Sequence, residues 1–431
     1  MLCTTYMSER DWGFHTRCLH AGHEPDAETG AAAPPIYQTT SYEFEDAETA
    51  AELYALERDD HVYSRISNPT TATLERRLAS LHGGTGACAT SSGMAALDAA
   101  TLVLADAGDN VVSASAVYGG THAYLSYTAS RRGIETRFVD TLDPDAYAEA
   151  IDENTAYVHL ETIGNPALVT PPIEETAAVA HDHGVPLFVD NTFATPALCR
   201  PFDHGADLVW ESTTKGIHGS GTTVGGVLVD GGSFPWAEHA EKYPEVTANP
   251  AFDGADFTER FGDRAFEYAA RHRGLRSLGD QQSPFDAWTT LQGTETLGLR
   301  MERHCENALA VAEWLADHSA VAWVNHPGLA DHETHDLATE YLDGYGGMVT
   351  FGLEGGYDAG KRVCESVEVA TFLANIGDAR TLVIHPASTT HAQLSEAEQR
   401  ASGVTPDMLR LSVGLEDSAD IVADLAEAIE P

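Results

Sequence analysis

The sequence predicts an α/β protein in which a mostly parallel sheet is covered by helices and is followed by a smaller α+β domain. Short β-rich runs alternate with helical stretches from residue 68 to about 230, and such alternation is typical of parallel sheets with helices on both faces. The 431 residues are enough for two or three domains. A hydrophobic content of 43% argues against a disordered acidic chain.

The first region is expected to supply six strands, since each is a short run rich in apolar or β-branched residues bounded by polar or turn residues. Helical patterns at 92–105 and 173–183 lie between these runs. Ligands of such sheets bind beyond the carboxyl ends of the strands. The expected strands are 87–90, 110–113, 136–139, 156–160, 186–189 and 225–229.

The last third of the chain is predicted to mix helices and strands. Ser283-Pro284 is a good helix start, a capping residue followed by proline. A helical apolar pattern follows at 301–315, and strands are expected at 348–351 and 409–413. A final helix capped by Ser418 closes the chain.

These patterns divide the chain into three parts. Residues 1–67 have little periodicity and form an arm that contacts a partner subunit, because they hold too little apolar sequence for a core. Residues 68–282 form the α/β domain, with an insertion at 231–282 that is rich in aromatic residues, acids and glycine. Residues 283–431 form the C-terminal α+β domain.

The charge balance limits the possible partners. The chain has 24 basic and 67 acidic residues, a net charge of −43, and these charges are spread along its whole length. So negative a surface argues against binding to nucleic acid or to anionic membranes. Arginine outnumbers lysine 21 to 3. This composition is typical of a cytoplasmic protein from a salt-loving organism, where strong screening makes the charge tolerable.

The cysteines and the N-terminus favour a reduced, cytoplasmic setting. Six scattered cysteines form no CxxC pair, so a disulfide framework is not expected. Cys18, His20 and His23 lack a fourth ligand, and no metal site is predicted. No run reaches the ~18 apolar residues that span a bilayer. The start lacks a secretory signal, and either Met1 or Met7 could be the first residue.

Lys215 is the strongest candidate for a catalytic residue. It lies among hydroxyl residues and glycines after an apolar run, and the only other lysines are Lys242 and Lys361. Because lysine is so rare in this chain, a lysine at this place indicates that an amine is required there. An arginine could not replace it, since a guanidinium does not form an imine. The simpler alternative is a chance surface lysine.

Two further places fit a phosphorylated aromatic ligand. Ser91-Ser92-Gly93-Met94 follows a strand and opens a helix, and backbone N–H groups at a helix start attract phosphate. Asp190 ends an apolar strand, where a carboxylate needs a cationic partner such as a protonated pyridine nitrogen. The plain alternatives are an ordinary serine cap and an aspartate that caps the next turn.

Hydroxyl and aromatic side chains complete the set. If the segment before Lys215 is extended, Ser212 and Thr214 project to the same side and can bind phosphate oxygens. Tyr118, in Tyr118-Gly119-Gly120 after a strand, could stack on an aromatic ring and move protons. A simple turn is the alternative there. Together these features describe a site for pyridoxal 5′-phosphate, whose usual partners are a lysine and an acidic residue at the pyridinium.

From about Phe14 to Ile429 the chain resembles the Cys/Met-metabolism family of pyridoxal-phosphate enzymes, and within it the O-acetylhomoserine sulfhydrylase branch. The resemblance implies the type I fold of such enzymes, with a seven-stranded sheet domain. The residues that show it are Leu19–Gly22, Pro35–Tyr42, Tyr63–Arg65, Ser91–Met94, Glu161–Pro166, Val189–Phe193, the Lys215 segment and Thr381–His391.

The resemblance implies a role for each candidate in cofactor binding. The phosphate would be held by the amides of Gly93 and Met94, by Ser212 and Thr214, and by Tyr63 and Arg65 from a neighbouring subunit. The ring would be held by Lys215, by Tyr118 stacked on it, by Asn165 at its hydroxyl, and by Asp190, with Thr192 beside it, at the nitrogen.

The same resemblance implies the substrate contacts and the assembly. Arg410 would bind the substrate carboxylate, with a backbone contact from Thr381, while Lys215 and Tyr118 would be the catalytic residues. Because the arm would complete a neighbour's site, a dimer is the expected minimal unit and a homotetramer, a dimer of dimers, the expected assembly.

The implied reaction converts O-acetyl-L-homoserine and sulfide to L-homocysteine and acetate, a step of methionine biosynthesis. The insertion at 231–282 favours this branch, as does Gly120, where methionine γ-lyases usually have cysteine. The bulkier residue and glycines common after the lysine are replaced here by Gly216-Ile217-His218, so the resemblance does not define the pocket floor, although the implied chemistry is unaffected. Three alternatives remain: a methionine γ-lyase or cystathionine enzyme, O-succinylhomoserine as donor, and a catalytically silent binding protein.

Overall fold

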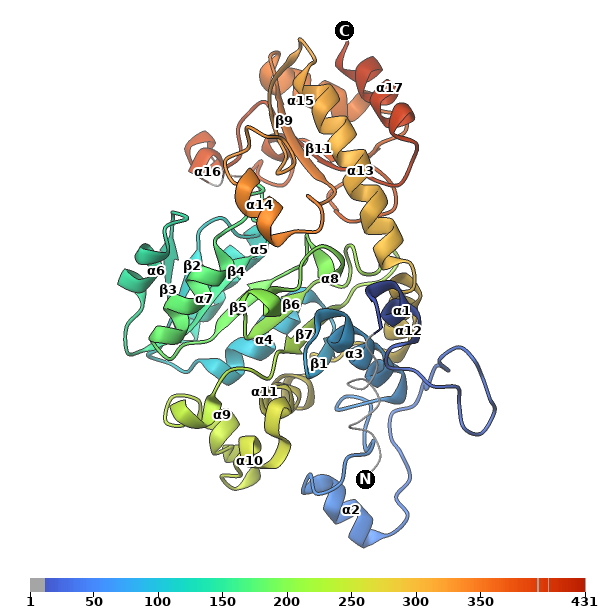
Figure 1. Cartoon of the computed structure of the whole chain (residues 1–431), viewed down its shortest axis with the longest axis vertical. Helices are drawn as coiled ribbons and strands as arrows, with labels where there is room; N and C mark the ends of the chain where they lie inside the picture. The colour runs from blue at the N-terminus through green and yellow to red at the C-terminus, as the bar shows by residue number, and fades with distance from the viewer. Residues whose placement is uncertain (1–11, 394, 402, 431) are drawn as a thin grey trace.

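The computed structural model describes residues 12–393, 395–401 and 403–430. The choice between Met1 and Met7 as the first residue lies outside these residues. Figure 1 shows a large sheet with helices around it and a second, smaller sheet beside it, reached through the long helix α13 (Leu297–Ala316). The predicted α/β architecture with a smaller α+β part is confirmed.

The larger sheet has seven strands in the order β1-β7-β6-β5-β4-β2-β3. Strands β2 to β6 pair in parallel, whereas β7 is antiparallel to both of its neighbours. All six predicted strands are present, and β6 is added, which the sequence showed only as an apolar run. The strands are β1 Gly86–Thr90, β2 Asn110–Ala114, β3 Glu135–Val139, β4 Thr155–Glu161, β5 Leu187–Asp190, β6 Leu208–Glu211 and β7 Gly226–Asp230.

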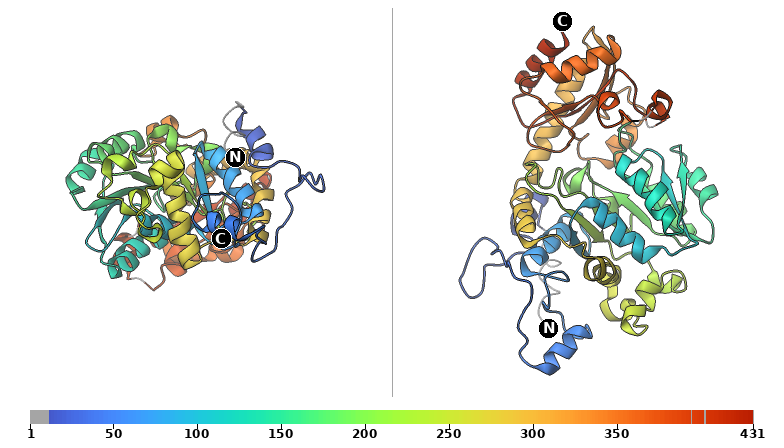
Figure 2. Two further views of the ribbon diagram at one scale, coloured as in Figure 1. Left: turned by 90° about the horizontal axis from the view of Figure 1, so that it is seen from below. Right: turned by 180° about the vertical axis from the view of Figure 1, so that it is seen from behind.

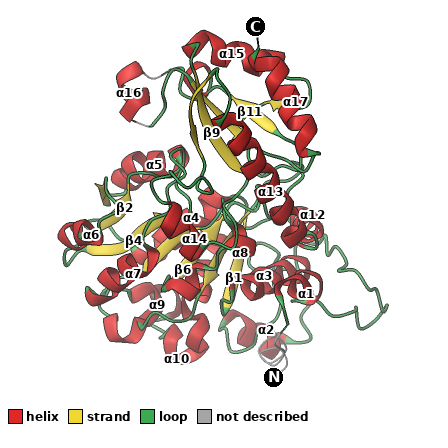
Figure 3. Cartoon of the chain, turned by 45° about the horizontal axis from the view of Figure 1, so that its top comes forward, coloured by secondary structure: helices red, strands yellow, loops and turns green. Residues whose placement is uncertain are grey.

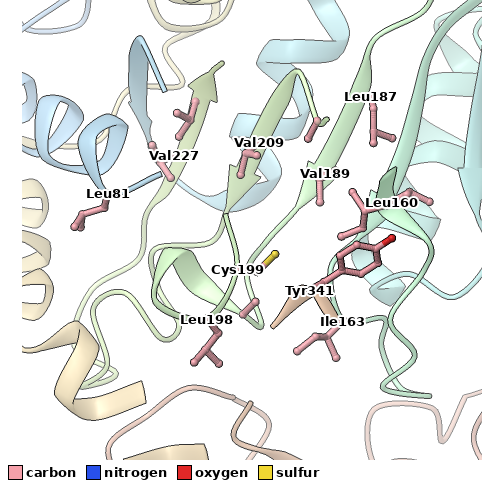
Figure 4. Packing of buried hydrophobic residues seen from close by; sticks show 14 of the residues in the cluster. Leu81, Leu160, Ile163, Leu187, Val189, Leu198, Cys199, Val209, Val227 and Tyr341 are labelled. Carbon is pink, nitrogen blue, oxygen red and sulfur yellow. The ribbon is translucent and has the colours of Figure 1, made fainter. Parts of the chain in front are cut away.

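Alternation along the central strands builds two hydrophobic layers. In β5, Leu187 and Val189 face one cluster and Phe188 faces the other. In β6, Val209 joins the first layer and Trp210 the second, because successive side chains of a strand point to opposite faces. Figure 4 shows the first layer between the strands and the neighbouring helices. A sheet buried on both faces explains why these strands read as almost continuous apolar runs.

Helices cover both faces of this sheet (Figure 2). The predicted helix at 92–105 is α4, which begins after the capping residue Ser92, and that at 173–183 is α7. The arm holds two short helices. The helices of the arm and of the larger-sheet region are α1 Phe14–His20, α2 Ala47–Tyr54, α3 Pro69–His82, α4 Gly93–Leu104, α5 Gly119–Ala123, α6 Pro144–Ala150, α7 Ile173–Asp182 and α8 Thr195–Leu198.

The stretch at 231–282 folds into short helices that pack against the sheet. Its aromatic residues Phe234, Trp236, Tyr243 and Phe266 are buried in the second hydrophobic cluster. This explains why an acidic insertion is rich in aromatic residues: they supply the apolar area that covers one face of the sheet. Its helices are α9 Pro244–Thr247, α10 Phe257–Phe261 and α11 Ala265–Ala270, followed by a π-helical turn at Arg271–Arg276.

The C-terminal part is a five-stranded sheet with helices, seen at the top of Figure 3. Ser283 caps α12 as predicted, whereas the last helix is capped at Asp417 and Ser418 is its first residue. The helices are α12 Pro284–Thr294, α13, α14 His335–Tyr341, α15 Gly356–Ser366, α16 Glu396–Ala401 and α17 Ser418–Ile429. The strands are β8 Val321–Asn325, β9 Met348–Leu353, β10 Thr371–Phe372, β11 Leu382–Ile384 and β12 Met408–Ser412.

None of the described helices is both long and apolar enough to cross a membrane. Within the same residues, no three or more histidine, cysteine or acidic side chains are grouped to hold a metal ion.

Candidate functional site

Three neighbouring strands of the larger sheet end in buried carboxyl groups. Glu161 ends β4, Asp190 ends β5 and Glu211 ends β6, and Glu161 lies opposite Asp190 in register. Glu211 has partners in His82, at 3.3 Å, and in the Asn191 side chain, which donates to it at 2.8 Å. Ligands of parallel sheets bind beyond this edge, so the three carboxyls mark where a site is expected.

Asp190 is buried without a cationic partner among the described residues. Its side chain is only 6% exposed. Thr192 donates to its Oδ1 twice, from the backbone amide at 2.9 Å and from the hydroxyl at 2.5 Å. Burial raises the pKa of Asp190 to about 7 despite these bonds. A protonated ring nitrogen would supply the missing positive charge, as the sequence predicts.

Lys215 lies in the turn that follows β6. Its Nζ donates to Oδ1 of Asn375 at 2.5 Å, a contact that joins the two parts of the chain. Burial, and then the positive charge of Arg410, lower the pKa of Lys215. A lowered pKa increases the fraction of neutral amine at a given pH, and the neutral amine is the form that attacks an aldehyde.

The segment around Lys215 is turned rather than extended, which corrects our expectation. The Lys215 amide donates to the Ser212 carbonyl at 3.2 Å, and the Gly219 amide donates to the Lys215 carbonyl at 2.8 Å. Arg300 on α13 holds this turn by donating to the carbonyls of Gly216, at 2.6 Å, and Ile217, at 2.8 Å. Several short local bonds outcompete strand pairing here, and the alternation argument for the side chains does not apply.

The start of α4 nevertheless packs closely against Ser212, as a phosphate-binding site at this helix N-terminus requires. The amides of Gly93 and Met94 open the helix and have no acceptor within it. A Cβ on Gly93 would lie 2.9 Å from that of Ser212, so only glycine allows this approach. Thr214 exchanges hydrogen bonds with Gly225, at 3.0 and 3.1 Å.

Tyr118 precedes α5 and is anchored through its backbone. Its amide donates to Oε1 of Glu161 at 2.6 Å, while 48% of its side chain is exposed. A Cβ at Gly120 would overlap the Tyr118 ring. Glycine at this position therefore permits the ring orientation seen here, which a cysteine would disturb.

Arg410 on β12 is a largely buried guanidinium without an anionic partner in the described part of the chain. Burial lowers its pKa, and the nearby Tyr118 opposes this. A buried cation is costly unless it is paired, so an incoming carboxylate would be bound well. Thr381 differs: its amide donates to Glu416 at 2.7 Å and its carbonyl accepts from Thr371 at 2.8 Å. Its contact with the substrate stays a prediction, and the amide would have to leave Glu416 to make it.

The remaining predicted residues are Asn165, which lies near the ends of the strands, and Tyr63 and Arg65, which lie in the arm. Asn165 is buried in the loop after β4, four residues beyond Glu161. Tyr63 and Arg65 pack on each other, with the guanidinium 5.4 Å from the ring centre. They lie at the end of the arm, and among the described residues neither forms a hydrogen bond or ion pair with the site of its own chain.

Sequence reasoning missed three residues of the site. Glu161 had the same signal as Asp190, a carboxyl at the end of an apolar strand. Asn375 and Arg300 gave no local signal, because they reach the Lys215 turn from distant parts of the chain. Ile217, which is unusual for this branch, is buried in the first hydrophobic cluster.

These residues fit pyridoxal phosphate by their chemistry. A helix start with free amides and a glycine-only contact suits the phosphate, an uncompensated buried carboxyl suits the pyridinium, and an amine of lowered pKa suits the aldehyde. An open cavity of about 660 Å³ lies beside Thr214 and Asn375, and polar side chains of Ser91, Gln281, Gln282 and Asp286 line it.

Comparison with known proteins agrees with this geometry. A homocysteine synthase of Schizosaccharomyces pombe is 50% identical over 97% of this chain and 98% of its own length. O-acetyl-L-homoserine sulfhydrylase 1 of Thermus thermophilus is 49% identical over 96% and 99%. A crystal structure described as an O-acetylhomoserine (thiol)-lyase of Campylobacter jejuni, which contains pyridoxyl-lysine 5′-monophosphate, matches with a TM-score of 0.92 at 37% identity over 97% of this chain and all of that one.

A family match covers nearly the whole chain as well. Residues 15–430 match the family described as Cys/Met metabolism PLP-dependent enzyme. The cofactor is therefore pyridoxal phosphate. Fold, site chemistry and sequence agree: the chain belongs to the Cys/Met-metabolism family of pyridoxal-phosphate-dependent enzymes.

Proposed function

We propose that this chain is an O-acetylhomoserine sulfhydrylase, which converts O-acetyl-L-homoserine and sulfide to L-homocysteine and acetate. Full-length relatives at 49–50% identity are named for this chemistry. The observation in the structure that carries the proposal is Arg410, a largely buried guanidinium without an anionic partner in the described residues, which acts on the pKa of Lys215. An amino-acid carboxylate bound there would bring its α-carbon close to the amine.

We assign the cofactor contacts as follows. The amides of Gly93 and Met94 with Ser212 and Thr214 hold the phosphate, and Asp190, oriented by Thr192, pairs with the ring nitrogen. Tyr118 covers the ring and Asn165 lies at its hydroxyl. When bound, pyridoxal phosphate supplies a ring that accepts electrons from the substrate carbon.

The chain's own residues then bind the substrate and move protons. Arg410 holds the substrate carboxylate and thereby orients the α-C–H bond. With the cofactor bound, Lys215 Nζ would remove the α-proton and later return one. Asn375 Oδ1 accepts a hydrogen bond from this amine and keeps it in place. The Tyr118 hydroxyl shares proton transfers as acetate leaves and sulfide adds.

Product analysis tests this function against its nearest alternatives. In high salt, the purified protein with cofactor is supplied with O-acetylhomoserine and sulfide, with O-succinylhomoserine and sulfide, or with methionine or cystathionine alone. Homocysteine and acetate formed fastest from the first mixture support the proposal. Release of 2-oxobutanoate and ammonia as the faster reaction would make the protein a γ-lyase, and homocysteine formed faster from the succinyl ester would change the donor.

We also propose that each active site is shared between two subunits, in a homotetramer built of two such dimers. The described part of the arm, residues 12–67, extends away from the C-terminal sheet (Figure 1) and exposes apolar side chains such as Tyr54, at 60%. A surface of this kind is expected to be covered. Residues 68–282 and 283–431 are the two domains of the subunit, and the partner's arm brings Tyr63 and Arg65 to the phosphate.

Subunit complementation tests the shared site. Arg65→Ala is expected to release the cofactor more readily without unfolding the subunit, because it removes one charge from the phosphate. Mixed with Lys215→Ala protein, it should recover activity, since one site of each mixed dimer then has both residues intact. No recovery despite subunit exchange shown by mass spectrometry, or full activity in a strictly monomeric preparation, would show that sites are not shared.

A further inference from the structure

We propose that Glu161 is a positioning residue that fixes Tyr118 over the cofactor ring, and that it does so as a neutral carboxylic acid. The inference rests on the proposed function only in placing the ring next to Tyr118. It concerns a buried group that the mechanism above does not use.

Glu161 connects the end of β4 with the turn that precedes α5. It is the last residue of β4 and is only 4% exposed, and its Oε1 accepts the Tyr118 amide at 2.6 Å. Tyr118 follows β2 and begins the turn into α5. Because the tyrosine ring is half exposed, its place depends on the backbone, and Glu161 is the side chain that holds this backbone.

The surroundings of Glu161 favour the neutral acid. Asp190 lies opposite it on β5, and Glu211 ends β6 one strand further. Among the described residues no lysine, arginine or histidine bonds to Glu161. Burial, and then the negative charge of Asp190, raise the pKa of Glu161 well above its usual range, although hydrogen bonds from the backbone of Tyr118 and Asn165 oppose this. Two adjacent buried carboxyls are not both ionised readily, and Asp190 is the one with a pyridinium to pair with.

Substitution separates the hydrogen bond from the charge. Glu161→Gln keeps an acceptor for the Tyr118 amide and cannot ionise, whereas Glu161→Leu keeps the bulk and removes the acceptor. Leaving a buried N–H without a partner destabilises the arrangement that holds the ring, and we expect about tenfold faster release of cofactor. The matched control is Glu175→Leu, because Glu175 accepts a hydrogen bond from Tyr341, at 3.1 Å, outside the site.

The readouts are the release rate of the cofactor and its visible circular dichroism, which reports how the ring is held. We expect Glu161→Gln and Glu175→Leu to match the unchanged protein within about twofold, and Glu161→Leu to release cofactor about tenfold faster with an altered dichroism band. Release by Glu161→Gln as fast as by Glu161→Leu would show that the charge is needed. An unchanged Glu161→Leu would show that Glu161 does not position Tyr118.

A second measurement tests, even if Glu161→Leu fails to fold, whether Glu161 gains or loses a proton when the cofactor binds. Calorimetry of cofactor binding to the apoprotein, in buffers of different ionisation enthalpy, counts the protons taken up or released. The unchanged protein and Glu161→Gln should give the same count, because Glu161 keeps its proton throughout. Different counts would overturn the neutral acid. Neither readout involves sulfide or acetylhomoserine, so failure here is distinct from failure of the proposed function.

Discussion

Lys215→Ala is expected to lower turnover by more than about a thousandfold, since both the amine that binds the aldehyde and the general base are lost. The purified variant should also lack the yellow colour of the lysine-bound cofactor. Steady-state homocysteine production and the visible spectrum measure these two effects. The matched control is Lys361→Ala, which changes an exposed lysine paired with Glu365 on α15 and should alter neither.

Two further measurements on the Lys215→Ala variant test this prediction. Added ammonia or a small amine restores part of the activity if only the base is missing, while the overall fold of the variant stays intact. A Lys215→Ala protein that remained yellow and turned over at the normal rate would remove Lys215 from the chemistry.

Asp190→Asn is expected to weaken catalysis by about a hundredfold or more and, at the same time, to stabilise the apoprotein at neutral pH. The rate falls because the amide cannot keep the ring nitrogen protonated. Stability rises because burial raises the pKa of Asp190 to about 7 in the folded chain, from 3.8 as an ordinary aspartate. Between these values, the folded state binds a proton that the unfolded state has lost.

The sign of the effect follows from this linkage. The contribution of Asp190 to stability is fully present below its unfolded pKa and is lost as the pH rises through the folded one. The melting temperatures of variant and unchanged apoprotein should therefore be similar near pH 4 and diverge up to about pH 7, with the asparagine variant higher. Bound cofactor should stabilise the unchanged protein more than it stabilises the Asp190→Asn variant. An asparagine variant that is less stable at pH 8 than at pH 4, relative to the unchanged apoprotein, would contradict this assignment.

The parts of the site with a local sequence signal could be predicted. Lys215 was conspicuous in a chain of three lysines, Asp190 ended an apolar strand, and Ser92 preceded a helix after a strand. Asn375 and Arg300 reach the Lys215 turn from distant parts of the chain, and no local pattern reports such packing. Their role in holding the Lys215 turn emerges only from the fold.

The same distinction holds for the strands. The buried strands of the larger sheet can be predicted from their apolar runs, and β6 also has such a run, although it is not among the six expected strands. In the C-terminal sheet, β10 has two exposed residues and β8 is half buried, so neither shows a clear pattern. The segment at Lys215 is a turn and not extended as expected, because its backbone hydrogen bonds form within the segment, which strand periodicity does not describe.

Chemical mapping of the bound cofactor tests the central claim most directly. The holoprotein is reduced with borohydride, which makes the bond between cofactor and lysine permanent, then digested and analysed by mass spectrometry. Only Lys215, Lys242 and Lys361 can carry the label. We predict one pyridoxyl phosphate per chain, on the peptide that contains Lys215. A label on Lys242 or Lys361, or no label in a protein that is yellow and active, would contradict the site described above.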